Sequence, residues 1–239
     1  MTDVQASVTA GTAASAPPVA WIGIEERSLS LAELIAARGQ LAAGELIHHL
    51  GDGRATVRAN AARGLAAIGH AGTELIPFLR DGEPAVAAAA AEALAHLGLA
   101  ERLHLAAIAA ALDGARPEVG ETIRGMFAAL IGAADAELIG ALDTGQEAAA
   151  GAVVGACARA GVRGLQLLAQ AAKDERARVR INAVRGLALL GDVEQHTAMA
   201  VLSGVEGSDG VPDVRAAARA AIAVLTARCL SAATAQRKT

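Results

Sequence analysis

The stretch from Asp174 to Gly191, DERARVRINAVRGLALLG, decides the fold of this chain. Its apolar residues Val179, Leu187 and Leu190 recur at helical spacing, and its arginines lie off that stripe. An acidic pair of residues begins the stretch and a glycine ends it. The pattern therefore predicts one amphipathic helix that follows a short acidic turn.

The same pattern recurs along the chain. The most similar copy is DGRATVRANAARGLAAIG, which begins at Asp52. Counted from the valine as zero, both copies have Arg at +1, Asn at +3, Arg at +6, Gly at +7 and Leu at +8. Four weaker copies begin at 81, 113, 144 and 209, and their +8 residues are Leu94, Phe127, Cys157 and Ile222. Such a regular internal period is typical of stacked helical repeats.

These residues resemble a known repeat family. An Asp, a Val five residues later, an Arg directly after it and a small-residue helix ending in Leu-Gly are similar to the HEAT repeat. The similarity is to its short bacterial form, the phycobilisome-lyase-type HEAT-like repeat, and covers residues 39–228. The resemblance implies an all-α, right-handed α-solenoid of about six helix pairs. It also implies that the helix after each Val-Arg lines the concave side, and it says almost nothing about activity.

The segments outside the repeats differ in composition. Residues 1–18 are small, polar and interrupted by proline, which predicts a disordered tail. Residues 19–38 contain Trp21 and a capped helix start, and we expect them to cap the apolar end of the stack. The alternative is that Trp21 is a tether that inserts into a partner. Residues 229–239 are expected to be a frayed tail.

Composition limits the class of protein. Hydrophobic residues make up 54% of the chain, but there are only one Trp, two Phe and no Tyr, so the core must be aliphatic. Residues 81–147 carry a net charge of −8 and residues 148–239 a net charge of +5, which is either a random distribution or a polarised docking surface. The two cysteines lie inside helix patterns, as in a reducing compartment. We see no signal peptide and no apolar run long enough to span a membrane. These observations predict a cytoplasmic protein.

Six acidic and basic residues recur at fixed positions of the repeats. In three copies an Asp is followed six residues later by an Arg. An Asp in the turn can accept N–H groups at the next helix start, and the Arg can reach this Asp or its equivalent in a neighbouring repeat. We therefore expect a structural ladder formed by Asp52, Arg58, Asp174, Arg180, Asp209 and Arg215.

Candidate binding residues are those that differ between repeats on the predicted concave face. At +6 and +10 of the Val-Arg helices the side chains vary, as recognition residues and drifting surface residues both do. The candidates are Arg63, Glu92, His96, Arg159 and Arg185. Alanine and glycine dominate the middle of this face, which would admit a helix or an extended peptide. A second candidate, an anion patch, consists of Arg163, Lys173, Arg176 and Arg178.

Catalytic and metal chemistry finds little support in the sequence. Glu92 and His96 are four residues apart on one helix face, but two ligands without a third and fourth do not predict a metal site. No nucleophile is paired with a base, and no phosphate-binding glycine loop is present. The basic residues of 159–185 lack interleaved aromatic residues, so we do not expect nucleic-acid binding. We expect no catalytic residue, metal or cofactor.

Three functions are compatible with this pattern. The first is a non-catalytic scaffold or adaptor that binds a protein or peptide in its concave groove. The second, from the resemblance alone, is an accessory subunit similar to phycobilin lyases that binds a tetrapyrrole. The third is binding of acidic or phosphorylated ligands by the basic segment. We favour the first, and the sequence leaves the partner, the pathway and the oligomeric state open.

Overall fold

The computed structural model describes residues 39–70, 73–97, 105–190 and 195–236. The expected disordered tail 1–18 and the expected cap 19–38, including Trp21, lie outside the described residues. The described part of the chain consists of helices joined by short connections, and it contains no strand.

Each repeat is a pair of helices, and the second helix of each pair carries one copy of the repeated sequence pattern. The first helices are α2 (Ala43–His49, which follows the short 3-10 helix η1, Gly39–Ala42), the 3-10 helix η2 (Thr73–Arg80), α5 (Leu105–Ala111), α7 (Asp135–Ala141), α9 (Val162–Ala171) and α11 (Gln195–Ser208). The second helices are α3 (Ala55–Ala67), α4 (Pro84–Leu97), α6 (Pro117–Leu130), α8 (Glu147–Ala160), α10 (Ala177–Leu187) and α12 (Pro212–Gln236).

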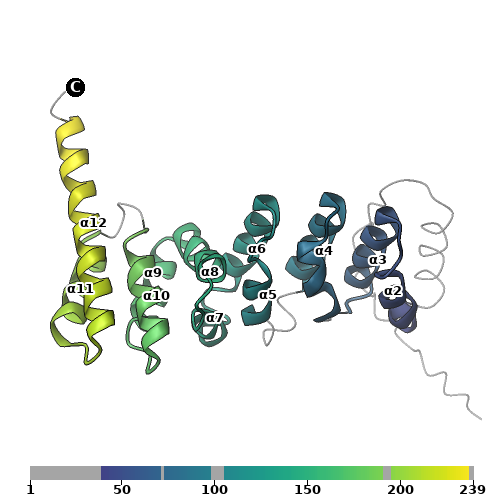
Figure 1. Ribbon diagram of the computed structural model, residues 1–239, viewed down its shortest axis with the longest axis horizontal. Helices are drawn as coiled ribbons and strands as arrows, with labels where there is room; N and C mark the ends of the chain where they lie inside the picture. Colours follow the sequence, from purple (N-terminus) through teal and green to yellow (C-terminus); the bar gives the residue numbers. More distant parts are fainter. Residues whose placement is uncertain (1–38, 71–72, 98–104, 191–194, 237–239) are drawn as a thin grey trace, which may run out of the picture.

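The helix pairs stack in chain order into an elongated molecule (Figure 1). The second helices form one layer, in which α3 packs on α4, α4 on α6, α6 on α8 and α10 on α12. The first helices form the other layer, from η2 through α5, α7 and α9 to α11. Contacts thus connect each repeat to its neighbours, which is the arrangement of an α-solenoid and confirms the predicted fold class.

Proline and glycine set the helix ends as the sequence predicts. Pro84, Pro117 and Pro212 are the first residues of α4, α6 and α12, where the missing N–H of proline costs no helical hydrogen bond. Gly161 has a φ of 59° between α8 and α9, a conformation that side chains with a Cβ rarely adopt. Within η2, Pro77 cannot donate a helical hydrogen bond, and this segment is a 3-10 helix.

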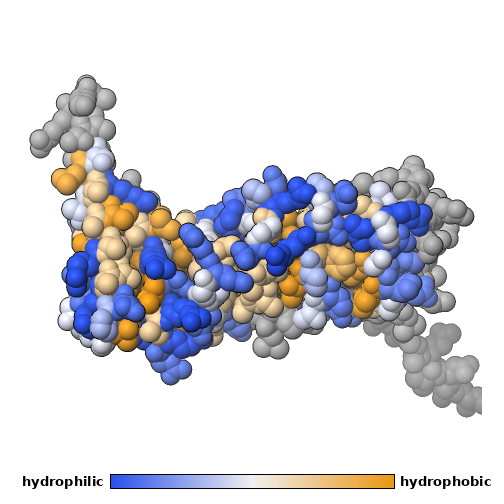
Figure 2. All heavy atoms as spheres, viewed as in Figure 1, coloured by the Kyte–Doolittle hydropathy of each residue, from blue (hydrophilic) through white to orange (hydrophobic). Residues whose placement is uncertain are grey.

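The C-terminal boundary differs from the prediction. The sequence interpretation ends the last helix at 228 and leaves 229–239 as a frayed tail, whereas α12 continues as helix through Gln236. The reason is that no glycine or proline follows Pro212, so alanine-rich sequence meets no helix-stop signal. The end of α12 stands clear of the stack, and the surface is hollowed beside it (Figure 2).

The core is aliphatic and continuous along the repeats. The +8 residues Leu65, Leu94, Phe127, Cys157 and Leu187 are all buried. Phe127 has the largest of the fully buried side chains among the described residues. The corresponding residue of α12, Ile222, is only partly buried. This difference follows from position, because the described chain provides no further repeat to cover α12.

Candidate partner-binding groove

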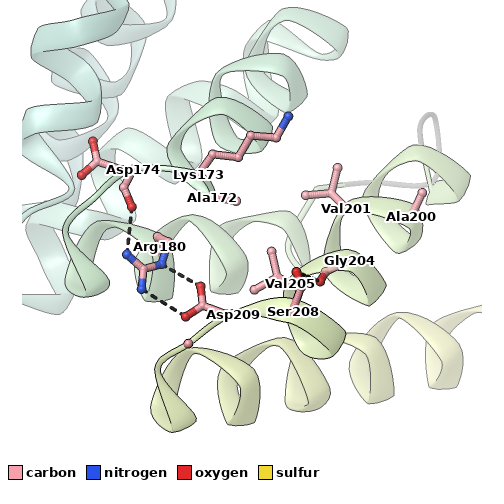
Figure 3. Close-up of a pocket in the computed structure, with 11 residues that line it drawn as sticks. Ala172, Lys173, Asp174, Arg180, Ala200, Val201, Gly204, Val205, Ser208 and Asp209 are labelled. Carbon is pink, nitrogen blue, oxygen red and sulfur yellow. Dashed lines mark hydrogen bonds and ion pairs between the residues drawn. The ribbon is translucent and has the colours of Figure 1, made fainter.

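A ladder of arginines and aspartates joins the repeats at both ends of the stack. In repeat five, Arg180 donates from Nη1 to the carbonyl oxygens of Asp174 and Glu175, each at 2.9 Å. Its Nε and Nη2 atoms bind the two carboxylate oxygens of Asp209 in the next repeat, at 2.7 and 3.1 Å (Figure 3). The guanidinium therefore holds its own turn and the following turn together.

Repeat one forms the same arrangement. Arg58 Nη1 donates to the carbonyl oxygens of Asp52, at 2.9 Å, and Gly53, at 3.2 Å. Its Nε and Nη2 bind the carboxylate of Asp81, in repeat two, at 3.1 and 2.9 Å. In both cases the arginine contacts the backbone of its own turn and the carboxylate of the next repeat. Sequence spacing had left open which of the two aspartates the arginine would reach.

The ladder aspartates also cap the turns before the second helices. Asp81 and Asp209 each accept a backbone N–H two residues later, at 2.9 and 2.8 Å. The hydrogen bond from Arg180, together with this N–H, holds the pKa of Asp209 below its ordinary value. Burial would raise the pKa of Asp81, but the hydrogen bonds from Arg58 and from the backbone outweigh it and lower that pKa. We assign these residues an architectural role.

The ladder is interrupted in the middle of the stack. Repeats two, three and four have Ala87, Gly120 and Ala150 where the ladder arginine would stand. Asp174 consequently receives no arginine from repeat four and is bound by Arg176 of its own turn, at 2.8 Å. That hydrogen bond lowers the pKa of Asp174.

Most of the predicted concave residues are engaged in contacts within the protein. Arg63 on α3 is largely buried and lies 3.9 Å from Glu92 on α4. Arg159 on α8 forms an ion pair with Glu121 on α6 and donates to its carbonyl oxygen at 3.2 Å. His96 is exposed near the end of α4. The structure therefore distributes these candidates over separate helices and does not gather them into one site.

Two charged residues of α6 were not singled out by the sequence. Glu121 binds both Arg124 and Arg159, and the hydrogen bond from Arg124 lowers its pKa. Arg124 lies across α8, where a Cβ on Gly155 would collide with its Cδ atom. Gly155, at +6 of repeat four, indicates close packing in the sequence. Which side chain packs against it is decided by the stacking of α6 on α8.

An open groove lies between the second helices α8 and α10 and has a volume of about 610 Å³. Its α8 wall includes the small residues Ala150 and Gly151, and Ala150 occupies the position of the missing ladder arginine of repeat four. Its α10 wall presents exposed Arg178 and Arg185 and a leucine, Leu189, that is 57% exposed. The remaining lining residues are Thr144, Gly145, Gln146, Glu147, Val154, Ile181, Asn182 and Gly186.

Buried contacts hold the two walls of the groove in place. The side-chain amide of Asn182 donates to the carbonyl oxygens of Leu142 and Thr144, at 2.8 and 2.9 Å. On the floor, a Cβ on Gly186 would come within 2.8 Å of Val154, so α10 approaches α8 closely at this point. The groove is therefore an opening in a packed layer and is bounded by fixed backbone.

The predicted anion patch is not one surface. Arg163 is near the start of α9, and Lys173 follows its end, so the length of that helix separates them. Arg176 binds Asp174 and lies 3.7 Å from Asp143. Only Arg178 of the four lines the groove. Lys173 instead lines a second cavity of about 720 Å³ beside α11, whose polar wall is the Arg180–Asp209 pair (Figure 3).

The cysteines and histidines show no grouping that suggests chemistry. Cys157 is buried in the core, and burial raises the pKa of its thiol to about 12. Cys229 is exposed on α12. Within the described ranges, no cluster of three or more His, Cys, Asp or Glu residues could hold a metal ion. No helix in the described part of the chain is both long and apolar enough to cross a membrane.

The comparisons with known proteins agree with the repeat architecture. The stacked helix pairs define the class of α-solenoid repeat proteins. A family model described as HEAT repeats matches residues 43–126, from α2 into α6. Residues 43–126 are thus similar to HEAT repeats, and the helix pairs beyond 126 continue the arrangement of the matched ones.

An engineered protein of known crystal structure is 18% identical to the chain, with a TM-score of 0.34, and the similarity covers 84% of this chain and 89% of that chain. No curated protein matches the chain.

Proposed function

We propose that this HEAT-repeat protein is a non-catalytic scaffold or adaptor that binds a protein or peptide partner in the groove between α8 and α10. HEAT repeats generally mediate protein interactions, which supports the class of function. The groove carries the proposal, because it combines a smooth small-residue wall with exposed apolar and charged side chains. Such a surface admits a helix or an extended peptide closely.

The exposed leucine is the central element of this site. Leu189 is 57% exposed, although the other leucines of α10 and its C-terminal turn, Leu187 and Leu190, are buried. An aliphatic side chain in a groove with a fixed backbone offers apolar area that a partner can bury without reorganising the protein. The arginines beside it would give orientation and specificity.

The aliphatic and charged lining favours a peptide over a flat aromatic ligand such as a tetrapyrrole. We further propose that the repeats are of the phycobilisome-lyase type, as the sequence pattern indicates. The proposal includes a cytoplasmic location. Absorbance titration with bilins or haem tests the tetrapyrrole alternative, which requires a spectral shift that depends on the groove residues.

Photo-crosslinking tests the proposed function. A benzophenone amino acid at position 189 should capture a discrete partner in a lysate of the native organism, and the same probe at Val224 provides the control. Val224 is also a partly exposed aliphatic residue, 43% exposed, but it lies on α12 outside the groove. The variant Leu189→Asp should lose co-purification of that same partner while keeping its helical circular dichroism. Equal capture at both positions, or co-purification that survives Leu189→Asp, would refute groove binding.

A further inference from the structure

Four cations of the C-terminal half, Arg163, Lys173, Arg178 and Arg185, have side chains that form no ion pair or backbone hydrogen bond with the described residues, and of these only Arg178 and Arg185 line the groove. Arg159, Arg176, Arg180 and Arg219 form ion pairs, and Arg215 and Arg228 donate to backbone carbonyl oxygens. Arg178 and Arg185 form neither contact with any residue that the structure describes. Their charges are thus available to a ligand.

The two guanidinium groups share one side of one helix. Arg178 and Arg185 are seven residues apart on α10, which is two helical turns. Ile181 lies between them and Leu189 lies one turn beyond, and all four residues line the groove. This wall is therefore a stripe of alternating cationic and aliphatic side chains, in which Arg178 and Arg185 are about 10 Å apart along the axis of α10 and Leu189 lies in the turn that follows the helix.

The opposite wall determines how close a ligand can come. It carries Ala150 and Gly151, which lack bulky side chains, so a ligand backbone can approach α8 closely. Its acidic residue, Glu147, is exposed at the start of α8. Two cations on one wall face this single carboxylate, so the groove has a net positive charge on its α10 side.

We propose that the groove binds an acidic amphipathic helix of a partner protein. Two carboxylates about two turns apart on that helix would pair with Arg178 and Arg185. An aliphatic side chain between them would cover Ile181, and a second one, one turn beyond, would cover Leu189. The helix repeat explains the match, because side chains seven residues apart on the ligand have the same spacing as those on α10. This inference rests on the proposed function and specifies the chemistry of the partner.

Synthetic peptides test the charge preference with the full chain. The acidic probe is a fluorescein-labelled, alanine-based helical peptide with two glutamates seven residues apart and a leucine between them. The matched probes have glutamine or lysine at the same two positions. Fluorescence anisotropy should show the glutamate peptide binding about tenfold more tightly than the glutamine peptide, as expected for two exposed charge pairs. Its affinity should fall as salt is raised.

Charge reversal provides the matched control. The double variant Arg178→Glu and Arg185→Glu should lose the glutamate peptide and gain the lysine peptide. Arg163→Glu reverses an exposed arginine on α9 outside the groove and should leave the preference unchanged. Equal binding of the glutamate and glutamine peptides would overturn the inference, as would a phosphoserine peptide that binds where the glutamate peptide does not.

Failure of this inference can be separated from failure of the proposed function. If the benzophenone at 189 captures a partner equally well in the charge-reversed protein, the groove binds a partner but not through these arginines, and the inference is wrong. If the charge-reversed protein loses both the captured partner and the glutamate peptide, the inference is supported. If position 189 captures nothing and no peptide binds, both proposals are overturned.

Discussion

The arginine ladder allows a graded prediction, because its three arginines have different sets of contacts. Arg180 and Arg58 each bind two carbonyl oxygens of their own turn and a carboxylate of the next repeat. Arg215 has the contact with its own turn, at 2.6 Å from the carbonyl oxygen of Asp209, and no next-repeat carboxylate among the described residues. Replacing each with alanine therefore removes different numbers of hydrogen bonds.

The magnitude follows from burial. The side chains of Arg180 and Asp209 are 14% and 8% exposed, so Arg180→Ala leaves a largely buried carboxylate without its cation. Loss of one partner of a buried pair costs about 3–5 kcal/mol, and partial exposure favours the lower value of about 3 kcal/mol. Arg58→Ala should cost about the same, because its pair with Asp81 is similarly covered, at 16% and 11% exposed. Arg215→Ala should cost about 1 kcal/mol.

Urea unfolding followed by far-UV circular dichroism measures the total loss of stability, and hydrogen exchange locates it. Because repeats contact only their neighbours, Arg180→Ala should lower protection in α11 and α12, and Arg58→Ala in α3 and α4. A cost for Arg215→Ala equal to that of Arg180→Ala would refute the reasoning. It would mean that the two hydrogen bonds to the carboxylate of the next repeat add nothing to the stability that the contact with the arginine's own turn provides.

The same pair predicts a pH dependence. The pKa of Asp209 is lower in the folded protein than its ordinary value, chiefly because of the hydrogen bond from Arg180. Its contribution to stability is therefore complete above the ordinary carboxyl pKa and is lost as the pH falls through the depressed one. The stability difference between the wild type and Arg180→Ala should shrink at acid pH. A difference that is constant from neutral to strongly acid pH would contradict this assignment.

Three further predictions compare buried with exposed positions. Leu187→Ala should cost about 2–5 kcal/mol in urea unfolding, because Leu187 is fully buried, and a surface-like cost would mean that the repeat register is wrong. Gly164→Ala should destabilise the folded protein, because the added Cβ would collide with the carbonyl oxygen of Cys157. Gly204→Ala adds its Cβ to open space and should stabilise the folded protein by up to about 1 kcal/mol. Thermal unfolding of the two variants measures the difference. Thiol titration of the native protein should label Cys229 rapidly and Cys157 only on unfolding.

Much of the fold is predictable because it is written in local sequence. The recurrence of Val-Arg and a buried +8 residue identifies the repeat, and proline or glycine at the helix ends locates most boundaries. The sequence pattern predicts the end of α12 too early, because the repeat pattern is lost after residue 228 although no glycine or proline stops the helix there. Leaving the periodic repeat does not by itself end a helix that is rich in alanine.

The candidate site was only partly predictable. Arg185 and Arg178 were chosen from the sequence, and the structure places both on one wall of the groove. Arg63 and Arg159 were chosen as concave-face residues by the same rule as Arg185, whereas Arg178 was chosen as part of the anion patch. Arg63 and Arg159 are engaged with acidic residues of adjacent helices. The rule selects positions on a helix face, and whether such a position meets a carboxylate depends on the residues of the neighbouring repeat.

The sequence alone determined the all-α repeat class, the helix pairing and the aliphatic core, because these depend on periodicity within about 30 residues. Only the tertiary structure decided which charges remain free and where the layer of second helices opens. Ion pairs between repeats join residues such as Arg180 and Asp209, 29 residues apart, whose meeting depends on how each helix crosses the next. The groove lies beside Ala150, which occupies the ladder position of repeat four, and its shape depends on the approach of α10 to α8 at Gly186. A one-dimensional pattern carries no information about that approach.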